Sequence, residues 1–531
     1  MSKIFLFFFI VGGVTFDLIN ACVELHSECN YWTGTFCCDD KNIRSLICCT
    51  NAWGNGTSTL SMVAVGTVYG WTTTMLLRLE KGDNVPMTIN STESSWIVSL
   101  TVIASMCGSF LGALLADYFG RKVCLLCSSM FFIGGWFAII FAVSANTLYI
   151  ARIIQGISVG MSYTANPMYV SEVADTNIRG ALGTLIAVNV FTGSLLTCCI
   201  GPYVSYTTLG IVLLSITIIF VLTFIWFPES PYFLAMKNRN KAAIQAIAFF
   251  KNVDFETAER ELQIIINNIN EEKSQSENWK VKVRHLLSSN NRKAFFMVLM
   301  LIVVQQLSGN FTTMQFLTQL FDEANVGIDV NIATIIVFAV GLVSGTLATI
   351  SVERAGRRKL LMWSSFFCAA TLTILATYLY LKHLNYPVEF IKVLPLIVIV
   401  LFQIVYQLGI GTLPNALIGE LFPTNAKGVA AAGITISDGI LGFLVSTFYN
   451  QIKEKWGNHT LYFSFATSCY LGFIFVLFCI PETKNKSFLE IQQELSRRGF
   501  RYNNSFKEKK EIEDVLTSRN LSIAPTTVST N

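Results

Sequence analysis

The chain has 531 residues, of which 53% are hydrophobic and only 14% are charged, a balance that excludes a water-soluble protein of this length and favours one whose apolar residues face lipid. The net charge of +4 is too small to indicate nucleic-acid binding. The sequence contains no Walker loop and no metal-ligand cluster. We therefore expect a membrane protein that is not an enzyme and holds neither a metal nor a cofactor.

The first 56 residues differ from the rest of the chain. Residues 4–19 form a short apolar run after Lys3, which is typical of a secretory signal peptide. The cysteines that follow have the density of a small disulfide framework: Cys22, Cys29, Cys37, Cys38, Cys48 and Cys49. An active signal would invert the topology that the later loops indicate. Two interpretations stay open, a fused or mispredicted first exon, which we favour, and a working extracellular module.

About twelve apolar runs follow, each long enough to cross a ~30 Å hydrocarbon core as a helix. A barrel is excluded because the alternating ten-residue repeat is absent. The expected fold is all-α, with an N-terminal six-helix half at 57–234, a cytoplasmic helical linker at 235–292, a C-terminal six-helix half at 293–481 and a tail at 482–531. The expected spans lie near residues 58–78, 95–116, 124–144, 148–172, 182–202, 209–228, 294–318, 331–352, 360–381, 393–419, 430–450 and 461–480.

The basic residues alternate from loop to loop. The loops between helices 3 and 4 and between helices 5 and 6 carry no Lys or Arg. The basic residues fall in the loops that follow the second, fourth, eighth and tenth helices: Arg121, Lys122, Arg179, Arg354, Arg357, Arg358, Lys359 and Lys427. The positive-inside rule places these loops, the linker and the C-terminal tail in the cytoplasm. The sequons at Asn90 and Asn458 then lie outside, where they can be glycosylated. We expect a multi-pass plasma-membrane protein that works as a monomer.

A charged string recurs after the second helix of each half. The string DYFGRK at 117–122 returns as ERAGRRK at 353–359. Each copy sets a carboxylate at a helix end and cations about one turn later, an arrangement that suits a breakable latch. The residues are Asp117, Gly120 and Arg121 in the first copy and Glu353, Gly356 and Arg357 in the second. With this motif and its repeat, the chain resembles the major facilitator superfamily; a simple positive-inside anchor is the alternative.

Five further strings narrow the resemblance: RIIQGISVG at 152–160, PMYVSEVADTNIRG at 167–180, PESPYFL at 228–234, QQLSG at 305–309 and PETKNKSFLEI at 481–491. Together they make residues 58–492 resemble the sugar porter family, and within it the insect facilitated trehalose transporter-like group. The resemblance implies facilitative transport of a sugar, trehalose or a hexose, by alternating access. The expected partners are a small-molecule sugar and the lipid bilayer.

Further charges at the inner helix ends extend the latch. Glu172 and Arg179 lie seven residues apart at the end of the fourth helix, and Glu420 and Lys427 repeat that spacing at the end of the tenth. Both sets can pair with the arginines of the repeated motif, and we include Glu229 of PESPYFL in the same switch. Such pairs would close the cytoplasmic side when made. Static surface salt bridges are the alternative.

The seventh helix carries the polar residues that a sugar pathway needs. A neutral polyol exchanges its water hydrogen bonds for amide and hydroxyl contacts at mid-membrane depth. By motif match, Gln305 and Gln306 correspond to the family's paired sugar-binding glutamines, and Asn310, Thr313 and Gln315 keep the rest of this helix polar. Hydrogen bonds between helices are the alternative use of these amides.

Other pocket positions depart from the family's pattern. Asn415 replaces the pocket tryptophan, Gly341 and Phe311 replace asparagines, and Asp438 appears on the eleventh helix. These changes put glucose in doubt as the substrate. A cavity enlarged at Asn415 and Gly341 favours a disaccharide such as trehalose, if the side chain of Phe311 does not refill it. Asp438 is expected to bind substrate or a proton, or to act as a structural hydrogen-bonding group.

The first helix indicates whether sugar transport is coupled to protons. The family's proton symporters use an acidic residue there, and the equivalent stretch VAVGTVYGWTTTML has none. Facilitated diffusion is therefore the preferred reading, with proton-coupled symport and a non-transporting sugar sensor as alternatives. On the tenth helix, Pro414 with Gly409 and Gly411 should weaken the helix, because proline removes a backbone hydrogen bond.

Overall fold

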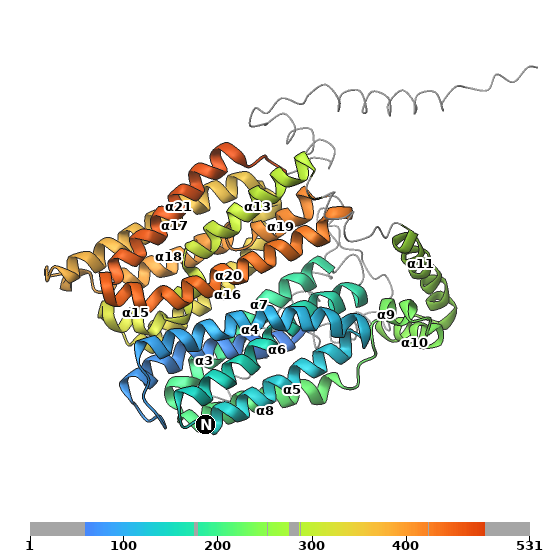
Figure 1. Cartoon of the computed structure of the whole chain (residues 1–531), viewed down its shortest axis with the longest axis horizontal. Coiled ribbons are helices and arrows are strands. Elements are labelled where there is room, and N and C mark those ends of the chain that lie inside the picture. The colour runs from blue at the N-terminus through green and yellow to red at the C-terminus, as the bar shows by residue number, and fades with distance from the viewer. Residues whose placement is uncertain are drawn as a thin grey trace, which may run out of the picture.

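The computed structural model describes residues 59–174, 179–251, 253–274, 286, 288–422 and 424–483. The cysteine-rich segment at 1–56 and the tail beyond Thr483 lie outside the described residues, so the predictions for them stay predictions. The described part is built from helices in two halves that lie side by side (Figure 1).

The N-terminal half contains six long helices, joined by short connections: α3 Ser61–Lys81, α4 Ser91–Tyr118, α5 Arg121–Ile140, α6 Ala145–Val173, α7 Arg179–Ile200 and α8 Tyr206–Phe224, with the short η1 Gly201–Tyr203 before α8. Polar side chains cap the N-terminal ends of three of these helices. Asn90 and Glu93 form a capping box at α4, and the hydroxyls of Ser144 and Ser205 accept backbone N–H groups at α6 and α8.

Among the described residues, the segment after α8 contains three helices, α9 Pro231–Met236, α10 Asn240–Lys251 and α11 Phe255–Ser274. The helix α10 is amphipathic, because it buries Ala243, Ile247 and Phe250 along one face. That face meets the N-terminal half, where the rings of Phe250 and Tyr169 lie 6.3 Å apart. We call this end of the bundle, at the right of Figure 1, the linker end, and the opposite end the far end.

The C-terminal half repeats the plan with more interruptions. Its elements are α13 Ser289–Leu307, α14 Asn310–Gln315, α15 Leu317–Ala324, α16 Val330–Ala355, α17 Arg357–His383, η2 Glu389–Ile391, α18 Leu394–Leu408, α19 Leu413–Leu421, α20 Thr424–Trp456 and α21 Asn458–Cys479. The first three occupy the single helix expected at 294–318, and α18 with α19 occupies the one expected at 393–419. The predicted weak point before Pro414 is therefore a break in the helix.

The break between α13 and α14 was not predicted. Gly309 has φ +71°, and a Cβ atom there would lie only 2.2 Å from the ring of Phe465. Both the backbone conformation and the space therefore require glycine. The glycine of the QQLSG string thus separates α13 from α14, which carries the polar residues that follow.

Ten helical segments of the described residues are long and apolar enough to cross a membrane. The remaining long helices of the two halves, α3 and α6, are too polar to qualify. Their buried polar residues include Thr72 and Thr73 on α3 and Arg152 and Gln155 on α6. The two helices with the weakest hydropathy are thus the ones that place polar side chains inside the protein, and the twelve-span plan agrees with the fold.

The halves touch from the middle of the bundle to its far end. At the centre the rings of Tyr69 and Phe311 meet edge to face at 5.6 Å. Nearer the far end, the Thr73 hydroxyl donates to Met314 O at 3.0 Å and the Thr318 hydroxyl donates to Thr73 O at 2.7 Å. These hydrogen bonds join α3 of one half to the α14–α15 segment of the other, so the far end is closed.

Candidate functional site

The first latch is a buried ion pair at the linker end. Arg121 opens α5 with its side chain only 4% exposed, and its Nε and Nη2 donate to Glu172 Oε1 at 3.0 and 2.9 Å. The guanidinium carbon also lies 5.2 Å from the ring centre of Phe233. Asp117 is a peripheral partner, at 3.8 Å and 67% exposed. Because Arg121 and Glu172 are largely desolvated, losing either one leaves an uncompensated charge.

Glu229 holds the turn beside this pair. Its carboxylate accepts the backbone N–H of Lys122 at 3.0 Å and that of Ser230 at 2.8 Å. Gly120 has φ +113°, and a Cβ atom there would lie 2.2 Å from Glu229 Oε2. Glycine is therefore required for the carboxylate to approach the backbone. The structure brings Gly120, Arg121, Glu172 and Glu229 together, as the sequence predicts.

The second latch repeats this geometry in the C-terminal half. Arg357 Nε donates to Glu420 Oε1 at 3.0 Å, and the Arg357 backbone N–H donates to Glu482 Oε1 at 3.0 Å. Gly356 has φ +89°, and a Cβ atom there would lie 3.0 Å from Glu482 Oε2. This pair is more open than the first, with the side chains of Arg357 and Glu420 22% and 26% exposed.

Glu482 was missed as a switch residue by the sequence analysis. The signal was present, because the string PES at Pro228 returns as PET at Pro481, each after the last helix of its half. The side chains of Arg179, Glu353 and Lys427 lie outside the described residues, so their places in the latches stay predictions.

Each described latch joins helices of one half only. Arg121 and Glu172 connect α5 to α6, and Arg357 and Glu420 connect α17 to α19. The expectation that these pairs themselves hold the cytoplasmic side shut is therefore revised. The described contacts fix the ends of helices within a half, and the part of these pairs in closure stays a prediction.

A partly paired amide lies where α13 meets the break between α18 and α19. Gln305 Nε2 donates to Gly411 O at 3.2 Å, while its Oε1 is buried and has no partner among the described residues. The neighbouring Gln306 donates to Asp438 Oδ1 at 2.6 Å. An unmet buried polar group costs about 1–3 kcal/mol, so Gln305 Oε1 needs water or a solute.

Gln403 on α18 was also missed by the sequence analysis. Its side chain is 1% exposed, and neither of its amide atoms has a partner in the described part of the chain. A glutamine inside the apolar run LFQIVYQL was the available signal. On α14, Asn310 is buried with its Oδ1 unpaired, and Thr313 and Gln315 are buried nearby in sequence. The expected polar stretch after QQLSG is thus an interior feature.

Of the two positions expected to enlarge the pocket, Gly341 is filled and Asn415 is exposed. A Cβ atom on Gly341 would lie 3.0 Å from the ring of Phe191 and 3.2 Å from Gln403 Nε2, so the missing side chain leaves no open space. Phe311 packs against Tyr69 across the two halves. Asn415 is exposed at the start of α19. The enlarged cavity that favoured a disaccharide is therefore not found at Gly341.

Arg152 on α6 is a buried cation without a carboxylate partner among the described residues. It is 1% exposed, and its donors reach Ile97 O, Gln155 Oε1 and the hydroxyl of Thr72 on α3. Its guanidinium carbon lies 5.3 Å from the ring centre of Trp71. Neutral acceptors and an aromatic face thus stabilise the charge in place of an acid.

Paired latches, two six-helix halves and a polar interior define a membrane transporter of the major facilitator type. The sequence profile of the family described as "Sugar (and other) transporter" matches residues 56–495, which is most of the chain. The chain belongs to this family, and it is a transporter rather than an enzyme.

Curated relatives and solved structures agree with this assignment. The facilitated trehalose transporter Tret1 of Bombyx mori is 31% identical over 454 residues, which cover 84% of this chain and 87% of the relative. Tret1 of Polypedilum vanderplanki is 28% identical over 439 residues, covering 83% and 86%. The inward open xylose transporter XylE from E. coli superposes with a TM-score of 0.67 at 20% identity, covering 83% and 98%, and shows the fold.

Proposed function

We propose that this chain carries a neutral sugar, trehalose or a hexose, across the plasma membrane by facilitated diffusion and alternating access. The observation that carries the proposal is the set of buried amide atoms left unpaired at the centre, on Gln305 and Gln403. Neutral amides at mid-membrane depth suit the hydroxyls of a sugar better than an ion or an apolar solute. The relatives named as facilitated trehalose transporters support trehalose as the first substrate to test.

The linker end is assigned to the cytoplasm. It carries Arg121, Lys122, Arg357 and Arg358, and the positive-inside rule favours the cytoplasm for such loops. The far end then faces the external solution, and the C-terminal tail is cytoplasmic. The closed far end corresponds to a carrier that is shut on its outer side. A monomer suffices for this cycle, because both halves lie in one chain.

Uncoupled transport is favoured by the surroundings of Arg152. The side chains that meet it from α3 are the Thr72 hydroxyl and the Trp71 ring, and neither titrates in the physiological range. A proton-driven cycle needs a group that gains and loses a proton between states. Asp438 is the carboxylate near the central amides and makes symport the second candidate, but its hydrogen bond to Gln306 also fits a structural role.

A panel of labelled sugars and polyols in a cell that lacks sugar uptake tests the proposal. We expect uptake of at least one sugar, with Gln305→Ala weakening that substrate by about 1–3 kcal/mol, the cost of an unmet buried hydrogen bond. Binding without uptake would indicate a sensor. If no sugar or polyol is carried, or if Gln305→Ala is silent for the one that is, the sugar assignment fails and the transporter fold alone stands.

A further inference from the structure

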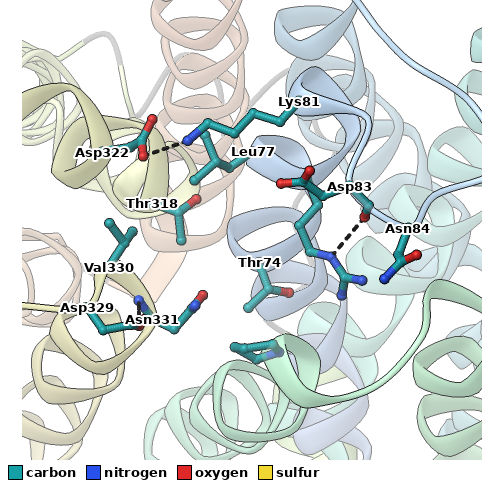
Figure 2. Close-up of a pocket in the computed structure, with 12 residues that line it drawn as sticks. Thr74, Leu77, Lys81, Asp83, Asn84, Thr318, Asp322, Asp329, Val330 and Asn331 are labelled. Carbon is teal, nitrogen blue, oxygen red and sulfur yellow. Dashed lines mark hydrogen bonds and ion pairs between the residues drawn. The ribbon is translucent and has the colours of Figure 1, made fainter.

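A cavity of about 330 Å³ opens at the far end between the two halves (Figure 2). The N-terminal half contributes Thr74 and Arg78 of α3 and Asn84 of the loop that follows. The C-terminal half contributes Thr318 of α15 and Asn331 of α16. The cavity is separate from the central glutamines, and no part of the transport cycle described above uses it.

Most charges that line this cavity are already compensated within the protein. Arg78 Nη1 donates to Gly201 O at 3.0 Å, and Lys81 pairs with Asp322 at 2.6 Å. Asp329 caps α16 by accepting the backbone N–H of Asn331 at 2.8 Å. An ion that bound at Lys81, Asp322 or Asp329 would have to displace one of these partners, so those side chains are poorly suited to hold an inorganic ion. Asp83 is the lining carboxylate outside these contacts.

The polar groups that remain suit a neutral solute with many hydroxyls. The amide of Asn331 offers donors and an acceptor toward the cavity in Figure 2, and the amide of Asn84 lies on the opposite wall. The hydroxyls of Thr74 and Thr318 donate to backbone carbonyls and keep lone pairs free to accept. Uncharged donors and acceptors on facing walls match the hydroxyl groups of a sugar or polyol.

The floor of the cavity is the closed contact between the halves. Thr318 lines the cavity and donates to Thr73 O, and Thr73 donates to Met314 O beneath it. Lys81 and Asp322 close one side with an ion pair that crosses from α3 to α15. Separating the halves at this end would pull these walls apart, so the cavity exists in this form only while the far end is closed.

We propose that the far-end cavity is a second solute site, which binds a neutral polyhydroxylated molecule from the external solution and holds the outer side of the carrier shut. The orientation rests on the proposed function, which places the far end outside. A solute that binds one of two conformations shifts the population toward it by its difference in affinity. An occupied cavity therefore slows the reopening of the carrier to the outside.

Protection of an introduced cysteine tests occupancy without relying on transport. Full-length Asn331→Cys is labelled with a membrane-impermeant maleimide from the far-end side, with and without external trehalose. Glu389→Cys, exposed on η2 and not among the residues that line the cavity, is the matched control, and the unsubstituted chain gives the background from its own cysteines. Glycine betaine, which has no hydroxyl groups, controls for osmotic effects.

We expect trehalose at about ten times its dissociation constant to slow labelling of Asn331→Cys about tenfold. Labelling of Glu389→Cys should not change, and glycine betaine should protect neither position. Equal labelling of Asn331→Cys with and without trehalose, up to molar concentration, would overturn the proposal. So would equal protection of both positions, because that would indicate a general effect of the solute.

A second experiment measures uptake over a wide range of external sugar concentrations. Uptake by the unsubstituted chain should rise, then fall at high concentration, as external sugar delays reopening. Asn331→Leu should abolish this fall, and Glu389→Leu should keep it at equal surface amount. If sugar is carried but the fall is absent or is kept in Asn331→Leu, the second site fails and the proposed function stands. If no sugar is carried, the proposed function fails, and the labelling arm still decides on the cavity.

Discussion

Glu482 occupies in the C-terminal half the place that Glu229 occupies in the N-terminal half. Each carboxylate lies against a glycine with positive φ and accepts a backbone N–H at 3.0 Å, from Arg357 and from Lys122 respectively. The correspondence is close but not identical, since the two donors differ by one position relative to the glycine. Each half thus ends in a carboxylate that supports its own latch, Glu229 in the first half and Glu482 in the second.

We expect Glu482→Ala to impair transport about as much as Glu229→Ala. Each change removes the acceptor of a partly buried backbone N–H, and the unmet bond costs up to about 1–3 kcal/mol. Initial uptake per molecule at the cell surface measures the effect, with Glu454→Ala, an exposed carboxylate at the far end, as the control. Normal uptake by Glu482→Ala beside a defective Glu229→Ala would show that the second carboxylate has no such role.

Replacing Arg121 or Arg357 by alanine should slow transport while leaving protein in the membrane. The first change should have the larger effect, because Arg121 and its partner Glu172 are less exposed than Arg357 and Glu420. Arg260→Ala on α11, which breaks a pair 71% and 77% exposed, is the matched control and should be silent. Unchanged uptake by both latch variants at equal surface expression would rule out the latch.

Transport should not accumulate sugar above its external concentration, and a protonophore should not change it. The reason is that Thr72, a non-titrating side chain, faces the buried Arg152. Asp438→Asn should keep transport, because an amide oxygen can still accept from Gln306. Accumulation that a protonophore abolishes, and that Asp438→Asn loses, would assign the protein to the symporters instead.

The ion pair between Lys81 and Asp322 should bias the carrier toward its closed outer side. The partners are 46% and 37% exposed, so the pair is worth at most about 1 kcal/mol, or a population shift of about fivefold. We expect Lys81→Ala or Asp322→Ala to lower the KM for external sugar by up to that factor. The charge-reversed double variant should restore the original KM; failure to restore it would show that the pair itself is not the cause.

Of the two predicted glycosylation sites, we expect Asn90 to carry the glycan. Asn90 is exposed and uses its side chain only to accept at the start of α4. The Nδ2 of Asn458, the atom to which a glycan attaches, donates to Glu323 Oε2 at 2.8 Å. Asn90→Gln should remove the mobility shift that enzymatic deglycosylation removes, and Asn458→Gln should not. A shift that survives Asn90→Gln would contradict this assignment.

Much of the fold could be predicted because lipid allows few solutions. Twelve apolar runs, one charged linker and a repeated motif were enough to place the halves, and the pairing of Arg121 with Glu172 followed from charge spacing. The helix break at Gly309 could not be predicted, since it depends on Phe465, which is distant in sequence. The same limit applied at Gly341, where the expected opening is bounded by Phe191 of the other half.

The helix interruptions described above all belong to the C-terminal half, between α13 and α14, between α14 and α15, and between α18 and α19. In the N-terminal half, Arg152 instead bonds α6 to carbonyls of α3 and α4, through Val68 O and Ile97 O at 3.3 Å each. The two halves are therefore expected to contribute differently to the transport cycle. We expect the first half to rock as a unit, and the hinge motions that admit and release a solute to occur in the second half, in the segments that begin at Gly309 and Gly409.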